Sequence, residues 1–270
     1  MIEKTDTDLL AEISKFLHYH KSLGITVYPR TTMLEHFLEE WDKKKPSPPQ
    51  KESLTRQKIG KYSKTSEQKH SFDPGLSAKT TLQDVREEIG DCKRCPLRKT
   101  RTNIVFGEGP SDAKLMIVAD APAEDDDRQC LPFQGPAGDL LDKMLAAINL
   151  ARQEVYLTTL VKCYPGAQAR PREDEIKTCF PFLLRQIEII CPTVICTLGM
   201  LTAQKMLHSR NSLFQLRGRF YNFNDLCSTD LNGKIVVMPS LPPSLLLENA
   251  DFKKASWKDL QMIQKKLEEG

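Results

Sequence analysis

The chain lacks the features that mark several protein classes. Aromatic residues make up only 7% of it, the formal net charge is only +3, and no apolar run approaches the roughly 18 residues that a membrane span needs. Its first residues, MIEKTDTDLLAEISKF, carry acids where a signal peptide has a basic start and a short apolar core. With 40% hydrophobic residues the chain is not collagen-like or wholly disordered. We therefore expect a soluble, cytoplasmic, globular protein with no membrane partner.

The small net charge is unevenly distributed. Residues 43–80 hold ten Lys or Arg against three acids, and Pro, Ser, Lys and Gln dominate there. Such a segment has almost nothing to bury, so it predicts a flexible linker. A basic arm that adds salt-sensitive attraction to nucleic acid is compatible with that interpretation. Apolar residues at helical spacing over 7–23 and 32–41 predict that residues 1–42 form a helical extension. Its role is not indicated by the sequence, and docking of a protein partner is one candidate.

A compact pattern begins at residue 81 and runs to residue 270. Four short apolar runs predict buried strands over 114–119, 155–161, 193–198 and 234–239. Helical patterns alternate with them over 138–149, 173–190, 200–208 and 251–268. This order predicts an α/β domain with a mainly parallel sheet that is covered on both faces. Ligands bind beyond the carboxyl ends of such strands, so we expect loops 119–138, 162–172 and 239–247 around one crevice.

The spacing of four of the eight cysteines indicates a metal site. Cys92 and Cys95 form a C-x-x-C pair, whereas Cys163 and Cys179 are separated by fifteen residues. A second C-x-x-C would have indicated zinc. The wide second pair suits a bulkier [4Fe–4S] cluster, which tolerates dispersed ligands. On spacing alone, an iron–sulfur cluster, a zinc ion and chance placement all stay open, while Cys196 is predicted to be a core residue.

Four stretches resemble family 4 uracil-DNA glycosylases, the iron–sulfur members of the uracil-DNA glycosylase superfamily. They are CKRCPL, RTNIVFGEGPSDAKLMIVADAPAEDDDRQCLPFQGPAGDLLDKML, VYLTTLVKCYPGAQARPREDEIKTCFPFLLRQIEIICPTVICTLG and MPSLPPSLLLENADFKKASWKDL, which span about residues 85–268. The resemblance implies a three-layer α/β/α sandwich around a short sheet. It also implies a [4Fe–4S] cluster on Cys92, Cys95, Cys163 and Cys179, with zinc as the alternative cofactor. DNA is the implied partner, and we expect a monomer.

The resemblance also implies an activity, the removal of uracil from DNA after the base is flipped out of the stack. Such a reaction needs a carboxylate near the sugar, a donor at the oxygen of the departing base and an aromatic surface for stacking. The family's GEAPG corresponds to residues 119–123, which implies a catalytic role for Asp120 and a base contact for Ala121. The family's PFVG corresponds to residues 132–135, which implies that Phe133 stacks on the base.

Other pocket positions depart from the family pattern. The Asn that reads the uracil edge falls on Thr159, and a later Asn falls on Gln168. The family's HPS is Pro242-Pro243-Ser244 here, so the usual histidine donor is replaced by proline. The serines beside this double proline, Ser240 and Ser244, are expected to contact the DNA backbone.

Charged residues near these loops have simpler interpretations. Lys162 and Arg170 are candidate phosphate neighbours, although solvated charge is the default for both. The acidic run 124–127 is interpreted as part of the matched motif rather than as a metal site. Two hypotheses follow: a glycosylase acting on uracil or another deaminated base, or a catalytically inactive module that binds DNA and recognises damage.

Overall fold

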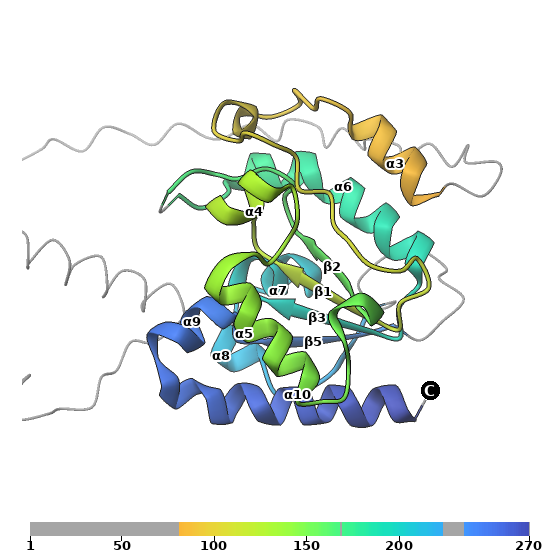
Figure 1. The fold of residues 1–270 in the computed structure, drawn as a ribbon, viewed down its shortest axis with the longest axis vertical. Helices are drawn as coiled ribbons and strands as arrows, with labels where there is room; N and C mark the ends of the chain where they lie inside the picture. The colour runs from red at the N-terminus through yellow and green to blue at the C-terminus, as the bar shows by residue number, and fades with distance from the viewer. Residues whose placement is uncertain (1–80, 168, 224–234, 270) are drawn as a thin grey trace, which may run out of the picture. The chain divides into compact units, whose positions relative to one another are not determined.

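The computed structural model describes residues 81–167, 169–223 and 235–269. The expected N-terminal extension over 1–42 and the expected linker over 43–80 therefore lie outside the described residues. Within the described part, the chain forms a mixed α/β unit whose sheet lies between helices (Figure 1).

The sheet has five strands in the order β2-β1-β3-β5-β4. Its strands are β1 (Leu115–Ala119), β2 (Tyr156–Thr159), β3 (Val194–Leu198), β4 (Tyr221–Asn222) and β5 (Val236–Ser240). The first three and β5 are parallel, while the short edge strand β4 runs antiparallel to β5. These parallel strands are almost completely buried, which explains why continuous apolar runs predicted them. The prediction was too long for β2 and began too early for β5.

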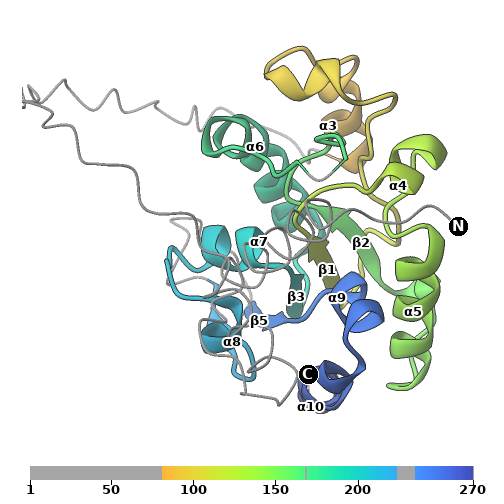
Figure 2. The same cartoon turned by 90° about the vertical axis from the view of Figure 1, so that its left-hand side faces the viewer.

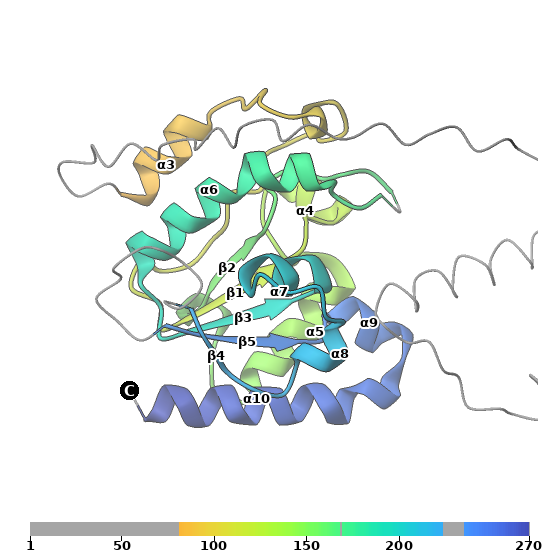
Figure 3. The same ribbon diagram turned by 180° about the vertical axis from the view of Figure 1, so that it is seen from behind.

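Helices cover both faces of this sheet, which confirms the predicted three-layer arrangement. Figure 2 places the strands between α6 (Glu173–Ile190) and α7 (Met200–Met206) on one side and α5 (Gly135–Ala146) and α9 (Pro243–Glu248) on the other. The long C-terminal helix α10 (Lys253–Glu268) runs along the lower edge in Figure 3 and contacts β3 and β5. In the described ranges, no helix combines the length and apolarity that crossing a membrane requires.

Several short elements were not predicted. They are α3 (Leu82–Ile89), η1 (Pro96–Lys99), α4 (Glu124–Gln129), η2 (Arg152–Glu154), α8 (Leu213–Leu216), α9 and η3 (Ala250–Phe252). Helix α3 begins with a capping box, in which the Thr81 hydroxyl accepts from the Asp84 N–H and the Asp84 carboxylate accepts from the Thr81 N–H. The helix then packs on α6 through a small core of Val85, Ile89, Phe106 and Phe182. Because Cys92 and Cys179 pack against the same core, this contact brings two distant cysteines together.

The strand order positions a crevice between β1 and β3. The chain leaves β1 for β2 on one side and then returns across β1 to β3 on the other, so the direction of winding reverses between these two strands. Open α/β sheets bind ligands at this switch point, outside the carboxyl ends of the strands. Asp120 directly follows β1 and Gly199 directly follows β3, so both lie at the switch point.

Candidate active site and cysteine centre

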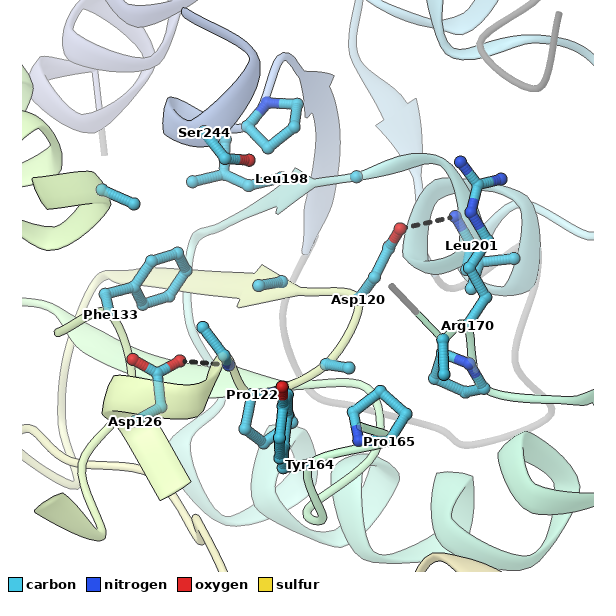
Figure 4. A pocket seen from close by; sticks show the side chains of 18 of the residues that line it. Asp120, Pro122, Asp126, Phe133, Tyr164, Pro165, Arg170, Leu198, Leu201 and Ser244 are labelled. Carbon is cyan, nitrogen blue, oxygen red and sulfur yellow. Dashed lines mark hydrogen bonds between the residues drawn. The ribbon is translucent and has the colours of Figure 1, made fainter. Parts of the chain in front are cut away.

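A pocket opens at the carboxyl ends of β1, β3 and β5 (Figure 4). Its walls come from residues 119–123, 164–166, 169–171, 198–201 and 242–244, with Asp126, Phe133, Gln134 and Ala137. The three predicted loops therefore do surround one crevice. Residues 198–201 form a fourth wall that was not predicted, although the carboxyl end of β3 has to meet the same edge of the sheet.

Asp120 joins the pocket to the start of helix α7. Its carboxylate accepts hydrogen bonds from the N–H groups of Leu201 (3.2 Å) and Thr202 (2.8 Å) and from the Thr202 hydroxyl (2.8 Å). Burial raises the pKa of this carboxyl, while these donors and the positive charge of Arg170 act in the opposite direction. The carboxylate thus caps a helix and faces the pocket at the same time, held in one orientation.

Gly199 makes room for that carboxylate. Its φ of +147° is a backbone conformation that side-chain-bearing residues rarely adopt, and a Cβ there would lie 2.3 Å from Asp120 Oδ1.

We expect Gly199→Ala to lower the free energy of unfolding by at least about 1–3 kcal/mol, because strain in the backbone adds to the clash with Asp120. Urea denaturation monitored by circular dichroism measures this effect. Gly166→Ala is a matched control, since its φ is also positive (+101°) but its nearest contact is 4.0 Å away, at Thr100 Cγ2. If both variants lost the same free energy of unfolding, the clash with Asp120 would not contribute to the effect of Gly199→Ala.

Phe133 lies in the opposite wall on a rigid turn. Its φ is +55° and its side chain is 8% exposed. The Asp126 carboxylate holds the turn by accepting from the Gln134 N–H (2.6 Å) and the Ala123 N–H (3.0 Å). At Gly138 a Cβ would lie 1.9 Å from the Phe133 carbonyl oxygen, so a glycine is needed there. The ring is therefore presented to the pocket by a fixed backbone, as a stacking surface requires.

The acidic run is structural. Asp126 and Asp127 are both buried, and the Asp127 carboxylate accepts from the N–H groups of Thr102 and Asn103 at 2.8–3.0 Å. These bonds fix helix α4 to the segment that precedes β1.

Most of the remaining pocket surface is apolar. The backbone and small side chains of Ala119, Ala121 and Ala123 form one wall, and Pro242 and Pro243 form part of another. Ala121 and Ser244 therefore line the pocket beside Asp120 and Phe133, as the sequence analysis expected of a common site. Tyr164, to which the sequence analysis gave no role, lines it as well.

Two expected site residues lie elsewhere. Thr159 is 1% exposed and is absent from the pocket walls, and its hydroxyl donates to the Val161 carbonyl (2.8 Å). Ser240 is also 1% exposed, and its hydroxyl donates to Asp259 Oδ2 (2.7 Å), a buried carboxylate that is paired with Arg217. Both side chains point into the core from strand ends, so the structure does not bring Thr159 or Ser240 into the pocket with Asp120 and Phe133.

The other three charged or polar candidates have different outcomes. Lys162 was considered a phosphate neighbour, but it is 1% exposed and its Nζ donates to the Thr158 hydroxyl (2.6 Å) and the Thr159 carbonyl (2.8 Å). Burial lowers its pKa to about 7. Arg170, in contrast, is exposed and lines the pocket. Gln168 lies outside the described residues.

The four cysteines of the predicted metal site line one small cavity. Cys92 follows α3, Cys95 caps η1, Cys163 follows β2 and Cys179 lies in α6. In the residues that the structure describes, no group of three or more His, Cys, Asp or Glu side chains is arranged around a single ion position. The convergence of all four thiols from three distant stretches is nevertheless the arrangement that the spacing suggested.

Hydrogen-bond donors point at the sulfur atoms of this cavity. Arg94 Nη1 lies 3.4 Å from Cys92 Sγ, Arg101 Nη1 lies 3.4 Å from Cys163 Sγ, and the Lys162 N–H lies 3.3 Å from Cys179 Sγ. Burial raises the pKa of Cys163 to about 11, and Arg101 opposes that shift. Donors of this kind stabilise negative charge on sulfur, which suits thiolates that bind a metal centre.

Comparisons with known proteins point to one family. The model of the uracil DNA glycosylase superfamily matches residues 106–261. A type-4 uracil-DNA glycosylase of Sulfurisphaera tokodaii is 38% identical over 188 residues, which cover 68% of this chain and 83% of that protein. One from Archaeoglobus fulgidus is 44% identical over 124 residues, 46% of this chain and 62% of that protein. A DNA polymerase of Bacillus phage SP01 is 30% identical over 164 residues, which cover 60% of this chain but 17% of the polymerase.

Proposed function

Because the chain belongs to the uracil-DNA glycosylase superfamily, we propose that it is a DNA-repair enzyme that hydrolyses the N-glycosidic bond of a flipped uracil or another deaminated base. The observation that carries this proposal is the pocket at the switch point of the sheet. It brings the carboxylate of Asp120 and the aromatic ring of Phe133 together from different loops. Both residues come from the stretches that carried the resemblance in the sequence.

The two side chains supply complementary parts of the chemistry. The transition state has oxocarbenium character in the sugar, so the Asp120 carboxylate stabilises that charge or orients the attacking water. The Phe133 ring stacks on the flipped base, and the fixed turn beneath it means that little ordering is needed on binding. Ala121 and Ser244 complete the contacts, with the base and the DNA backbone respectively. Gln168 stays a predicted base contact.

We propose that Cys92, Cys95, Cys163 and Cys179 hold a [4Fe–4S] cluster. Support comes from the single cavity that the four thiols line and from the donors of Arg94, Arg101 and the Lys162 backbone directed at their sulfurs. The four thiolates would hold the cluster between the segment after α3, the segment after β2 and α6, and so would link three distant stretches of the chain. Zinc is the alternative, and iron and sulfide analysis after anaerobic purification distinguishes the two.

An inactive damage-recognition module is the competing function. The observation that favours it is the absence of a side-chain donor at Pro242, which lines the pocket. The remaining predictions for this chain are a monomer in the cytoplasm, a linker over residues 43–80 and a protein-docking role for residues 1–42.

The test is base release by the anaerobically purified full chain. Single- and double-stranded oligonucleotides that contain uracil, hypoxanthine or xanthine are incubated with the protein and then treated with alkali, with a thymine oligonucleotide as control. We expect strand scission at uracil. No scission with any of the three bases, in protein that still binds the oligonucleotides, would reject the glycosylase and favour the recognition module.

A further inference from the structure

Breaking the bond between base and sugar leaves negative charge on the departing base. Part of that charge resides on the carbonyl oxygen next to the reacting nitrogen, so a fixed hydrogen-bond donor at this oxygen lowers the barrier. In the proposed glycosylase, on which this inference rests, a residue of the pocket has to supply that donor.

Few side chains in the pocket walls can donate. Pro242 and Pro243 have no donor, and the Gln134 amide is turned back onto the Pro132 carbonyl (3.1 Å), which occupies one of its two N–H hydrogens. Arg170 is a cation on an exposed side chain, and its charge opposes the rise in the pKa of Asp120. Tyr164 and Ser244 are the two hydroxyl donors in the pocket walls.

Of these two, Tyr164 is better fixed. Its ring stands between Pro122 and Pro165, with its hydroxyl oxygen pointing toward the pocket (Figure 4). Its carbonyl accepts from the Thr100 hydroxyl (2.7 Å), and the preceding residue, Cys163, forms a bridge with Ile104. Among the described residues, none hydrogen-bonds to the Tyr164 hydroxyl. Ser244, by contrast, is a short, exposed side chain in the first turn of α9.

A phenol also suits the task chemically. It keeps its proton near neutral pH, so it can donate to an oxygen on which charge develops. The ring stands beside Pro122 and Pro165 in the pocket wall, so the hydroxyl can meet a base that occupies the pocket.

We propose that the Tyr164 hydroxyl donates the hydrogen bond that stabilises the departing base. The donor would then come from the loop after β2. The wall at the start of α9 cannot supply it from Pro242 or Pro243, which have no side-chain donor.

The experiment compares Tyr164→Phe with the unchanged chain in single-turnover base release. On uracil we expect the rate to fall about 10²-fold, the effect of removing one such donor. On 5-fluorouracil, whose fluorine already stabilises the departing charge, we expect a clearly smaller loss. Tyr221→Phe is the matched control, because it removes a hydroxyl from the edge strand β4, outside the pocket walls, and should leave both rates unchanged.

Two outcomes would overturn the assignment. One is an equal loss by Tyr164→Phe on both bases, which indicates a structural role. The other is a leaving-group-dependent loss in Ser244→Ala but not in Tyr164→Phe, which would move the donor to α9.

A binding measurement separates failure of this assignment from failure of the proposed function. If the unchanged chain releases no base, the glycosylase proposal fails by itself. The affinity for an oligonucleotide with non-hydrolysable 2′-fluoro-2′-deoxyuridine then tests whether the Tyr164 hydroxyl contacts the base. Tyr164→Phe should weaken it about fivefold if the hydroxyl bonds the base, the usual effect of losing one hydrogen bond. Unchanged affinity would contradict the contact.

Discussion

Replacing Asp120 with asparagine is expected to lower the rate of uracil release about 10²–10³-fold, because the substitution removes the negative charge that faces the sugar. The amide oxygen of asparagine can replace Oδ1, which accepts from the Thr202 N–H and hydroxyl, but the NH2 group then faces the Leu201 N–H, so the cap of α7 is only partly retained. We therefore expect the free energy of unfolding to fall by about 1–3 kcal/mol, the cost of leaving one donor unsatisfied. Single-turnover release of labelled uracil and urea denaturation measure the two effects.

Asp112→Asn is the control for this experiment. Asp112 is exposed and precedes β1, at the end of the sheet away from the pocket, so its loss of charge should leave the rate unchanged. If Asp120→Asn released uracil at the rate of the unchanged chain, Asp120 would be a helix cap alone. The chemistry would then have to come from another group in the pocket.

The second large effect concerns the cysteine centre. Cys179→Ala is expected to reduce the iron content from about four atoms per chain to nearly none, because a [4Fe–4S] cluster needs all four thiolates. Without the cluster, nothing covalent joins α6 to η1 and the end of β2, so the yield of soluble protein should fall as well. Iron and acid-labile sulfide analysis after anaerobic purification measures the first effect.

Two other cysteines provide matched controls. Cys130→Ala changes an exposed thiol, and Cys196→Ala changes a buried core thiol in β3, so neither should alter the iron content. Cys196→Ala should cost some stability, since it opens a small cavity, but less solubility than Cys179→Ala. Equal iron content in all three variants would contradict the assignment of Cys179 as a ligand.

Much of the fold could be predicted from the sequence because buried parallel strands appear as continuous apolar runs. The bounds of α6 were predicted exactly as observed over 173–190, since its first turn holds three acids and a proline follows its end at residue 192. The helices that were missed are short. Helix α9 begins with proline and has only six residues, too few for a helical period to be recognised.

The candidate site was predicted less evenly, for a physical reason. Asp120 directly follows β1, and Phe133 lies between α4 and α5 in the connection that begins at the same strand end, so both come from a segment expected at the pocket. Thr159 and Ser240 are the last residues of strands, and there the direction of the side chain depends on which face of the sheet it joins. Lys162 was wrongly placed at the surface because only tertiary packing shows that its ammonium group has buried oxygen partners.

The central claim is that a flipped base occupies the pocket between Phe133 and Asp120. A crystal structure of the full chain with DNA that contains 2′-fluoro-2′-deoxyuridine tests it most directly. The account predicts the uracil ring outside the base stack, against the Phe133 ring, with its sugar beside the Asp120 carboxylate. A uracil that stays stacked in the DNA, or that lies in another part of the protein while this pocket holds only solvent, would contradict it.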